Sequence, residues 1–307
     1  MIRGIGRSLG VSGRRLAVGA ILALGLASDV RGQTPPAVAD RRAGAAELFL
    51  LGLEARHAEE PEAAARSFEA AVGLDPEAVL PRLEWAAALM VLGRSEAVEA
   101  ALKPLAGRID SLADSEPSLG ARYYRLRAAA ASRAGHTDRS LSLYETAARY
   151  APLDLGLRAQ LIGIYRARDA PERAIVHMQA AAELMPGNAD LRVELGRALL
   201  DLTRWAEAEE VFRSALAIRL GHEGAWDGLG LALAHQRRFA SAEEAFRAGL
   251  RVAPASARLY EHLGDALLND SRPEAALAAY RRAAALSPTD PAGLTAKIER
   301  ARAALPQ

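Results

Sequence analysis

Apolar and small residues recur along this chain with the spacing of paired amphipathic helices. Near residue 50 they are separated by three or four positions, which places them on one face of a helix. A second stripe of the same kind follows closely. The two stripes consist of Leu48, Leu51, Gly52 and Ala55, and then of Ala63, Phe68, Ala71 and Val72. Together they predict a helical hairpin in which each helix buries one face.

The same order of residues returns with a period of about 34 residues. Most copies place a small residue in the first helix, and each places a ring or large apolar residue between two small residues in the second. Pro closes most copies because it cannot continue a helix but suits the first turn of the next one. The first copy contains Gly52, Ala64, Phe68, Ala71 and Pro76. The period is interrupted once, before the copy that contains Ala128. The later copies contain Ala128 with Tyr144, Ile162 with Met178, Gly196 with Phe212, Gly230 with Phe246, and Gly264 with Tyr280.

The small residue and the ring have a common physical explanation. Two helix backbones approach closely only where a side chain is small, and a ring one turn away fills the remaining volume. A large side chain forced into the small position costs about 1–3 kcal/mol. The repeated motif therefore predicts close packing of the two helices in each copy.

These residues resemble the tetratricopeptide repeat family, in which each unit is an antiparallel pair of helices. The resemblance implies an all-α fold, a right-handed superhelical solenoid of about seven helix pairs plus a C-terminal capping helix. Units are expected to start near residues 45, 79, 121, 155, 189, 223 and 257. We expect units 1–2 in residues 45–112, units 3–7 in residues 121–290, and the capping helix and tail in residues 291–307.

The second unit departs from the repeated pattern. Val98 and Leu102 replace the expected Ala and aromatic residue, and Pro104 falls inside the expected second helix. We therefore expect a kink or break near Lys103. Residues 111–120 are rich in Ser, Asp, Pro and Gly, which predicts an inserted loop over residues 113–120.

Residues 1–32 have the order of a secretory signal peptide. Four arginines precede an apolar run over residues 16–27, and no acidic residue occurs before Asp29. The apolar run is too short to span a bilayer. We expect cleavage near Gly32, export to a bacterial periplasm or the medium, and a linker over residues 33–44. The alternatives are a twin-arginine signal at Arg14 and Arg15 and a mitochondrial transit peptide.

The composition argues against nucleic acid as a partner and excludes cysteine chemistry. Removal of residues 1–32, which carry five arginines and one aspartate, changes the formal net charge from +1 to −3. A mildly acidic protein is not a general nucleic-acid binder. The sequence has no cysteine, which excludes disulfides, thiolate metal sites and cysteine nucleophiles. Arginine is abundant while lysine occurs only as Lys103 and Lys297, which is typical of a GC-rich bacterial genome.

Patterns for catalysis or cofactor binding are weak. Gly228 and Gly230 lie within an expected helix without a preceding strand, so helix packing explains them better than a dinucleotide site. The six histidines are scattered over different units without metal-ligand spacing. We therefore expect no enzyme activity, no cofactor and no metal site.

In the resembled family, the first helices of successive units line a concave groove. The resemblance makes the residues between the packing positions candidates for contact with a partner. The candidates are Phe49, Leu53, Leu83 and Met90, then Arg122, Arg125, Arg133, Arg166 and Arg197, then Asp201, Asp227, Glu261 and Asp265, with Leu80 and Val91 adding to the apolar part. Because this order runs from apolar to basic to acidic, we expect a protein or peptide partner that carries acidic and apolar residues.

Two other interpretations apply to the same residues. The arginines can be a solvated helix face, because exposed charges contribute little by themselves. The apolar residues can be covered by residues 38–46 or by a second copy of the chain, because exposed apolar patches rarely stay bare. The family's clamp for chaperone tails uses Asn and Lys at inner positions that here hold other residues, so chaperone-tail binding is not expected.

Three functions compete on the sequence. The first, which we favour, is an exported, non-enzymatic protein–protein interaction scaffold that binds a polypeptide segment in its concave groove. The second is a periplasmic component of an envelope assembly, such as polysaccharide export, pilus or outer-membrane protein biogenesis. The third is an enzyme that carries tetratricopeptide units. We disfavour it because the repeats and the leader account for nearly the whole sequence.

Overall fold

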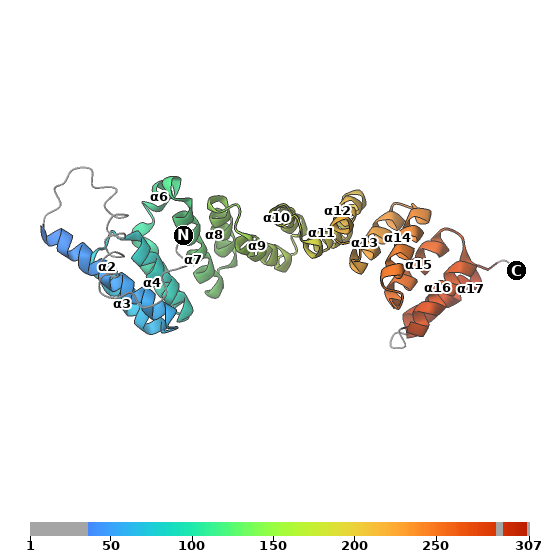
Figure 1. Cartoon of the computed structure of the whole chain (residues 1–307), viewed down its shortest axis with the longest axis horizontal. Coiled ribbons are helices and arrows are strands. Elements are labelled where there is room, and N and C mark those ends of the chain that lie inside the picture. Colours follow the sequence, from blue (N-terminus) through green and yellow to red (C-terminus); the bar gives the residue numbers. More distant parts are fainter. Residues whose placement is uncertain (1–35, 287–290, 306–307) are drawn as a thin grey trace. The chain divides into compact units, whose positions relative to one another are not determined.

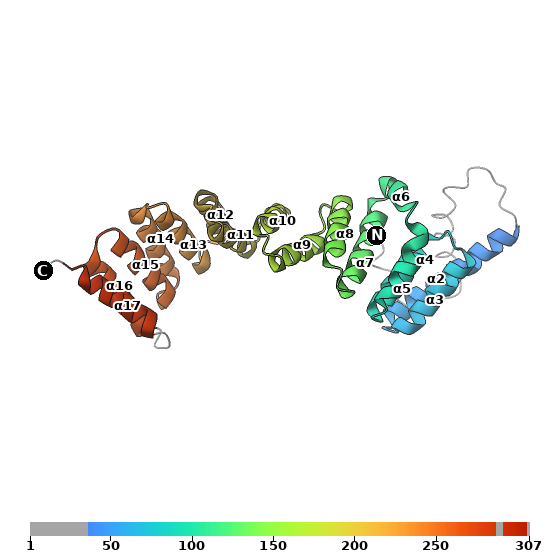
Figure 2. The ribbon, with the colours of Figure 1, turned by 180° about the vertical axis from the view of Figure 1, so that it is seen from behind.

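The computed structural model describes residues 36–286 and 291–305, so the expected signal peptide over residues 1–32 lies outside the described residues. Within the described ranges the chain forms sixteen α-helices and one short 3-10 helix, without any strand. It divides into two compact units, residues 1–157 and residues 158–307. Figure 1 colours the helices in chain order, and Figure 2 shows them from behind.

The first unit consists of three helix pairs and an insertion. Its helices are α2 (Pro36–His57), α3 (Pro61–Leu74), α4 (Val79–Val91), α5 (Ser95–Leu102), the 3-10 helix (Lys103–Leu105), α6 (Ile109–Ser115), α7 (Pro117–Arg133) and α8 (Thr137–Tyr150). The helix α2 packs against α3, α4 against α5, and α7 against α8, while α4 also contacts α7 (Figure 1). Consecutive pairs therefore bury apolar clusters between them, one between α2, α3 and α4 and one between α4, α5 and α7.

The second unit repeats the same arrangement. Starting with the helix that crosses the boundary between the units, the remaining helices are α9 (Leu155–Ala167), α10 (Pro171–Leu184), α11 (Ala189–Asp201), α12 (Trp205–Ile218), α13 (Glu223–His235), α14 (Phe239–Val252), α15 (Ala257–Asn269), α16 (Pro273–Leu286) and α17 (Pro291–Ala303). The first helices contact one another, α11 with α13 and α13 with α15, and α17 packs on α16. The expected all-α fold of seven helix pairs followed by one further helix is confirmed.

The predicted contact between a small residue and a ring is present in each glycine-containing pair. A Cβ placed on the glycine would lie 2.7 Å or less from a ring atom, which no real side chain tolerates without a shift. The pairs are Gly52 with Phe68, Gly196 with Phe212, Gly230 with Phe246, and Gly264 with Tyr280. All four rings are fully buried. The helices of a pair approach closely because the first lacks a side chain there.

Every helix pair turns through one residue with positive φ at the same place in the unit. These residues are Glu59, Gly93, Gly135, Asp169, Thr203, Arg237 and Ser271. The left-handed conformation lets the next backbone N–H groups reach the last carbonyls of the first helix. In the fifth pair, the amides of Thr203 and Arg204 donate to the carbonyls of Leu200 and Leu199, both at 2.9 Å.

The structure differs from the sequence-based expectation at the N-terminal end of the repeats. Helix α2 begins at Pro36, so residues 36–44, expected as part of the linker, are helical. Pro fits the first turn of a helix, where its missing N–H has no intrahelical partner. Gly44 lies against the side chain of Leu74 on α3, which anchors this part of α2. Residues 38–46 therefore form helix and do not lie as a loop over the apolar candidates.

The expected break near Lys103 is confirmed, but the expected loop over residues 113–120 is wrong. Helix α5 ends at Leu102, and Pro104 lies in the 3-10 helix. Residues 109–115 form α6, and α7 begins at Pro117. Leu105, Ile109 and Ala113 are fully buried at intervals of four residues, which makes an amphipathic stripe. Burial of this stripe outweighs the local preference of Ser and Asp for loops.

Hydrogen bonds hold the inserted helix α6 against the following pair. The hydroxyl groups of Tyr124 and Tyr150 both donate to Oδ1 of Asp110, at 2.6 and 3.0 Å. The two rings are stacked, with centroids 5.7 Å apart. Burial, followed by the contacts with Asp110, raises the pKa of Tyr124 well above its usual value. Gly120 lies under the ring of Tyr150, and a Cβ there would come within 3.1 Å of it.

Candidate functional site

The candidate partner contacts fall into three groups in the structure: buried residues, residues in ion pairs, and exposed residues. All of them lie on the first helices of their pairs, as the repeated pattern predicts. Their burial and their partners follow from contacts between neighbouring pairs, which the repeated pattern does not specify.

Three of the apolar candidates belong to the core, so the expectation that they are free for a partner is wrong. Phe49, Leu83 and Met90 are buried. The ring of Phe49 packs on that of Phe68 with centroids 5.7 Å apart. Leu83 and Met90 belong to the core cluster that α4 shares with α5 and α7. The next helix pair covers these positions. The apolar pattern of a single helix does not show which of its residues a neighbouring pair will cover.

The other apolar candidates of the first unit stay accessible to different degrees. Leu53 is half-buried against the core of the first pair. Leu80 is exposed at the start of α4, and Val91 at its end is 73% exposed. Val91 is thus the most accessible of the apolar candidates in this unit.

Arg122 forms an ion pair with the buried carboxylate of Glu84, which was not among the residues predicted from the sequence. Glu84 on α4 is buried, and its Oε2 lies 2.6 Å from Arg56 Nη1 and 2.8 Å from Arg122 Nη2. The three residues come from α2, α4 and α7. Glu84 therefore links the first helices of three consecutive pairs. A buried charge is tolerated only when it is paired, which explains why two guanidinium groups converge on it.

The remaining arginines of the first unit have weaker internal contacts. Arg125 Nη1 lies 3.3 Å from Asp154 Oδ2. Arg133 on α7 donates a hydrogen bond to the backbone carbonyl of Met90 on α4. A guanidinium that contacts a carbonyl keeps its positive charge uncompensated. Arg133 is therefore an exposed cation that contacts the backbone of α4 at the residue before Val91.

In the second unit, three candidates are exposed on α9 and α11: Arg166, Arg197 and Asp201. Arg166 Nη2 lies 3.9 Å from Sδ of Met178 on α10. Arg197 lies against Gly224 on α13, where a Cβ would come within 3.0 Å of its guanidinium. The structure brings Arg197 to the next first helix because that helix has no side chain at this point.

Asp227 is a packing residue, although the sequence suggested an accessible acid. Its side chain is buried, and its Oδ1 lies 2.6 Å from His262 Nδ1. Arg258 Nε lies 3.1 Å from the other carboxylate oxygen. Both partners come from α15, so the contact joins two consecutive first helices.

Glu261 and Asp265 form ion pairs with the last helix. Lys297 on α17 lies 2.6 Å from Glu261 and 2.7 Å from Asp265, and Tyr280 donates a hydrogen bond to Asp265 at 2.8 Å. Burial would lower the pKa of Lys297, but its hydrogen bonds to Asp265 and Glu261 raise it above the usual value. Lys297 therefore joins α17 to the acidic residues of α15. Leu294 and Ala301 of α17 are buried, as expected for a helix that covers the last repeat.

The arrangement leaves one part of the first unit suited to a partner. We define the α4–α7 strip as Leu80, Val91 and Arg133. The strip has exposed apolar side chains at both ends of α4 and the guanidinium group of Arg133 on α7. Across residues 36–286 and 291–305, no group of His, Cys, Asp and Glu has the arrangement of a metal site. In the same ranges, no helix combines the length and hydrophobicity needed to cross a bilayer.

These features define a class of protein, a helical-hairpin repeat protein whose first helices are joined by ion pairs. Family models described as tetratricopeptide repeat match residues 165–230 and residues 228–291. Both matches lie in the second unit, and they identify tetratricopeptide repeats in residues 165–291. The sequence has no significant match among curated proteins.

Solved structures of several repeat proteins are similar to the chain. MamA from Desulfovibrio magneticus RS-1 is 19% identical with a TM-score of 0.46, over 56% of this chain and 97% of that one. YrrB, described as a TPR protein with an unusual peptide-binding site, is 17% identical with a TM-score of 0.46, over 77% and 100%. A tetratricopeptide repeat protein from Parabacteroides merdae is 14% identical with a TM-score of 0.44, over 84% and 99%.

Proposed function

We propose that this protein is a non-enzymatic interaction scaffold that binds a polypeptide segment on the α4–α7 strip. One observation carries the proposal: Val91 is 73% exposed, and the guanidinium of Arg133 donates a hydrogen bond to the carbonyl of the preceding residue, Met90. The exposed side chain of Val91 offers an apolar anchor, and the guanidinium of Arg133 offers a fork that suits a carboxylate. The partner segment carries an apolar residue followed or preceded closely by an acidic one.

Three acidic candidates of the second unit have a structural role in this proposal. Asp227 is bound by Arg258 of α15, and Glu261 and Asp265 are bound by Lys297 of α17. A partner that approached them would have to displace these pairs. The proposal therefore removes them from the partner surface.

Affinity capture with matched variants tests this function. Partners captured by the wild-type protein are expected to be lost with Val91→Asp and with Arg133→Glu. Leu153→Asp and Arg149→Glu are the controls, because both residues are exposed in the same unit but lie outside the strip. Equal capture by all four variants would remove the strip from the proposal.

Export is a separate part of the proposal and rests on residues 1–32 of the sequence. Expression in a bacterial host, followed by mass measurement of the protein in the periplasmic fraction, tests it. The expected product begins at Gln33. A protein that keeps residues 1–32 and stays in the cytoplasm would contradict export without affecting the binding proposal. Co-purification with an envelope fraction would favour a component of an envelope assembly.

A further inference from the structure

A cavity of about 640 Å³ opens in the second unit, where the turn between α10 and α11 meets the end of α12. Met185 and Ile218 form its apolar wall, and each is 38% exposed. Gly187 also lines it, and a Cβ on this residue would meet no atom within 4 Å. Asp190 and Arg219 also line it. The cavity is separate from the α4–α7 strip, which belongs to the first unit.

The carboxylate and the guanidinium at the cavity are held side by side. Arg219 donates a hydrogen bond to Oδ1 of Asp190, and His222 Nε2 lies 3.1 Å from the same oxygen. The hydrogen bond from Arg219 lowers the pKa of Asp190, so its carboxylate is ionised at neutral pH. Because both contacts use Oδ1, Asp190 keeps Oδ2 as an acceptor, and Arg219 keeps further N–H donors. Both side chains are exposed.

This arrangement is complementary to an extended backbone. A peptide chain offers N–H donors and C=O acceptors in alternation, and the cavity offers an acceptor on Asp190 beside donors on Arg219. The opposite charges of the pair cancel, so the pair does not select a charged ligand. The apolar wall beside it suits one aliphatic side chain, whose burial supplies the favourable free energy.

We propose that this cavity binds an extended polypeptide segment. One leucine-like side chain lies between Met185 and Ile218, and the backbone of the segment bonds to Asp190 and Arg219. The site accepts an uncharged segment, whereas the α4–α7 strip accepts an apolar and acidic one. The two surfaces therefore recognise different chemistry.

The next repeat supplies a natural comparison. One repeat onward, the counterparts of Asp190, Arg219 and Ile218 are Gly224, Ala253 and Val252. The polar pair is absent from these positions, while the apolar residue is kept, because Val252 is 42% exposed. Val252 therefore provides a matched control for Ile218, with similar exposure and without the polar pair at the counterpart positions.

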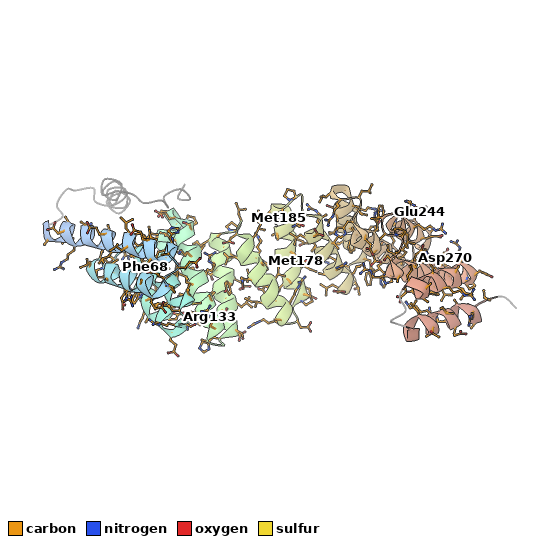
Figure 3. The ribbon with its side chains drawn as sticks, turned by 60° about the horizontal axis from the view of Figure 1, so that its bottom comes forward. Phe68, Arg133, Met178, Met185, Glu244 and Asp270 are labelled. Carbon is orange, nitrogen blue, oxygen red and sulfur yellow. The ribbon has the colours of Figure 1, made fainter. Side chains whose placement is uncertain are left out.

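Methionine methyl groups provide the readout for a binding test. Met185 is exposed, whereas Met90 and Met178 are buried, and Figure 3 shows Met185 at the edge of the ribbon and Met178 within it. The full chain labelled with carbon-13 at these methyl groups is titrated with acetyl-Ser-Gly-Leu-Gly-Ser-amide into the millimolar range. The peptide with Gly in place of Leu is the reference. The Leu peptide is expected to shift the Met185 signal saturably and to leave the buried methionines unchanged.

Variants at the cavity separate specific binding from a general effect. Ile218→Asp is expected to weaken binding of the Leu peptide at least about tenfold, because it places a charge in the apolar wall. Asp190→Ala is expected to weaken it as well, and this residue is too exposed for its loss to unfold the protein. Val252→Asp is expected to leave the binding unchanged.

Three outcomes would overturn the proposal. The Gly peptide could shift the Met185 signal as strongly as the Leu peptide does. Ile218→Asp and Asp190→Ala could both leave binding intact. Val252→Asp could weaken binding as much as Ile218→Asp. Partner capture by the α4–α7 strip is unaffected by these variants, so either proposal can fail without the other.

Discussion

Glu209 on α12 is bound by Arg238, which lies 29 residues further along the chain, with Nη1 at 2.9 and 2.8 Å from the two carboxylate oxygens. Gln236 donates a third hydrogen bond to Glu209 at 2.8 Å, and Arg213 lies 2.7 Å away on the same helix. The carboxylate is buried, while the guanidinium groups are half-exposed. The contact joins the second helix of one pair to the turn of the next.

The same relationship recurs one repeat onward. Glu243 contacts Arg247 at 2.7 Å and Arg272 at 2.5 Å. In two other repeats the equivalent position is held by Ile175 and Leu277, and both side chains are buried. The position therefore accepts either a paired carboxylate or an aliphatic side chain.

This comparison predicts how Glu209 responds to substitution. Glu209→Ala is expected to lower the free energy of unfolding by about 1–3 kcal/mol, because it removes charge-assisted hydrogen bonds and leaves a gap. Glu209→Ile, which copies Ile175, is expected to cost less than Glu209→Ala. Urea denaturation at neutral pH measures both. Glu207→Ala is the control, because Glu207 and Arg204 form an exposed pair worth less than about 1 kcal/mol. A larger loss with Ile than with Ala would contradict this explanation.

The pH dependence of stability follows from the same carboxylate. Burial would raise the pKa of Glu209, but the hydrogen bonds from Gln236 and Arg238 lower it below the ordinary value of 4.5. Between the two pKa values the unfolded chain binds more protons than the folded one. The contribution of Glu209 is therefore complete above pH 4.5 and is lost as the pH falls through the folded-state pKa. Glu209→Gln should give a shallower loss of stability with acid, and an unchanged acid limb would refute this assignment.

Gly228 is expected to be intolerant of even a methyl group. A Cβ on this residue would lie 2.1 Å from Cζ of Phe212, whose ring is fully buried. Gly228→Ala should therefore lower the free energy of unfolding by about 1–3 kcal/mol through overpacking. Thermal or urea denaturation followed by circular dichroism measures the change.

Gly163 on α9 is the matched control for this substitution. It also lies within a helix, but a Cβ there would meet no atom within 4 Å. Gly163→Ala is expected to stabilise the protein by about 0.5–1 kcal/mol, because Ala has the higher helix propensity. If both variants changed stability in the same direction, close packing at Gly228 would not be the cause.

Thr203 is a β-branched residue in a left-handed conformation, with φ of 58°. Glycine adopts this conformation without a steric penalty, whereas a residue with a Cβ pays about 1–2 kcal/mol. Thr203→Gly is therefore expected to raise the midpoint of urea denaturation. Gly93 occupies the equivalent turn with φ of 74°, so Gly93→Ala is expected to lower it. Gly107→Ala is the control, because its backbone is not left-handed and its surroundings are open.

Much of the fold could be predicted from the sequence, because the packing of each helix pair is local. Gly52 and Phe68 are sixteen residues apart, and their positions in two adjacent helices are fixed by the helical period alone. The inserted helix α6 could not be predicted in this way. Its residues Ser111 and Asp114 favour a loop, and only the burial of Ile109 against the neighbouring helices makes the helix favourable.

The candidate site was predicted less well, for a related reason. The sequence identified the first helices as the carriers of the charged residues, and the structure places all of those residues there. It did not reveal that Arg122 binds Glu84 or that Lys297 binds Glu261. These partners lie more than thirty residues apart and come from different helix pairs. Their contact depends on how far one pair is displaced along its neighbour.

The sequence by itself determined the paired helices, their period and the small residues that face a ring, because each of these depends on spacing within one repeat. Only the tertiary structure decided which charged side chains form ion pairs between repeats and which remain exposed. Ion pairing requires atoms from neighbouring pairs to lie within about 4 Å, and the packing of whole helices sets that distance. We propose that Val91 and Arg133 are available for a partner. Helix packing leaves Val91 exposed, and Arg133 contacts a backbone carbonyl, which does not neutralise its charge.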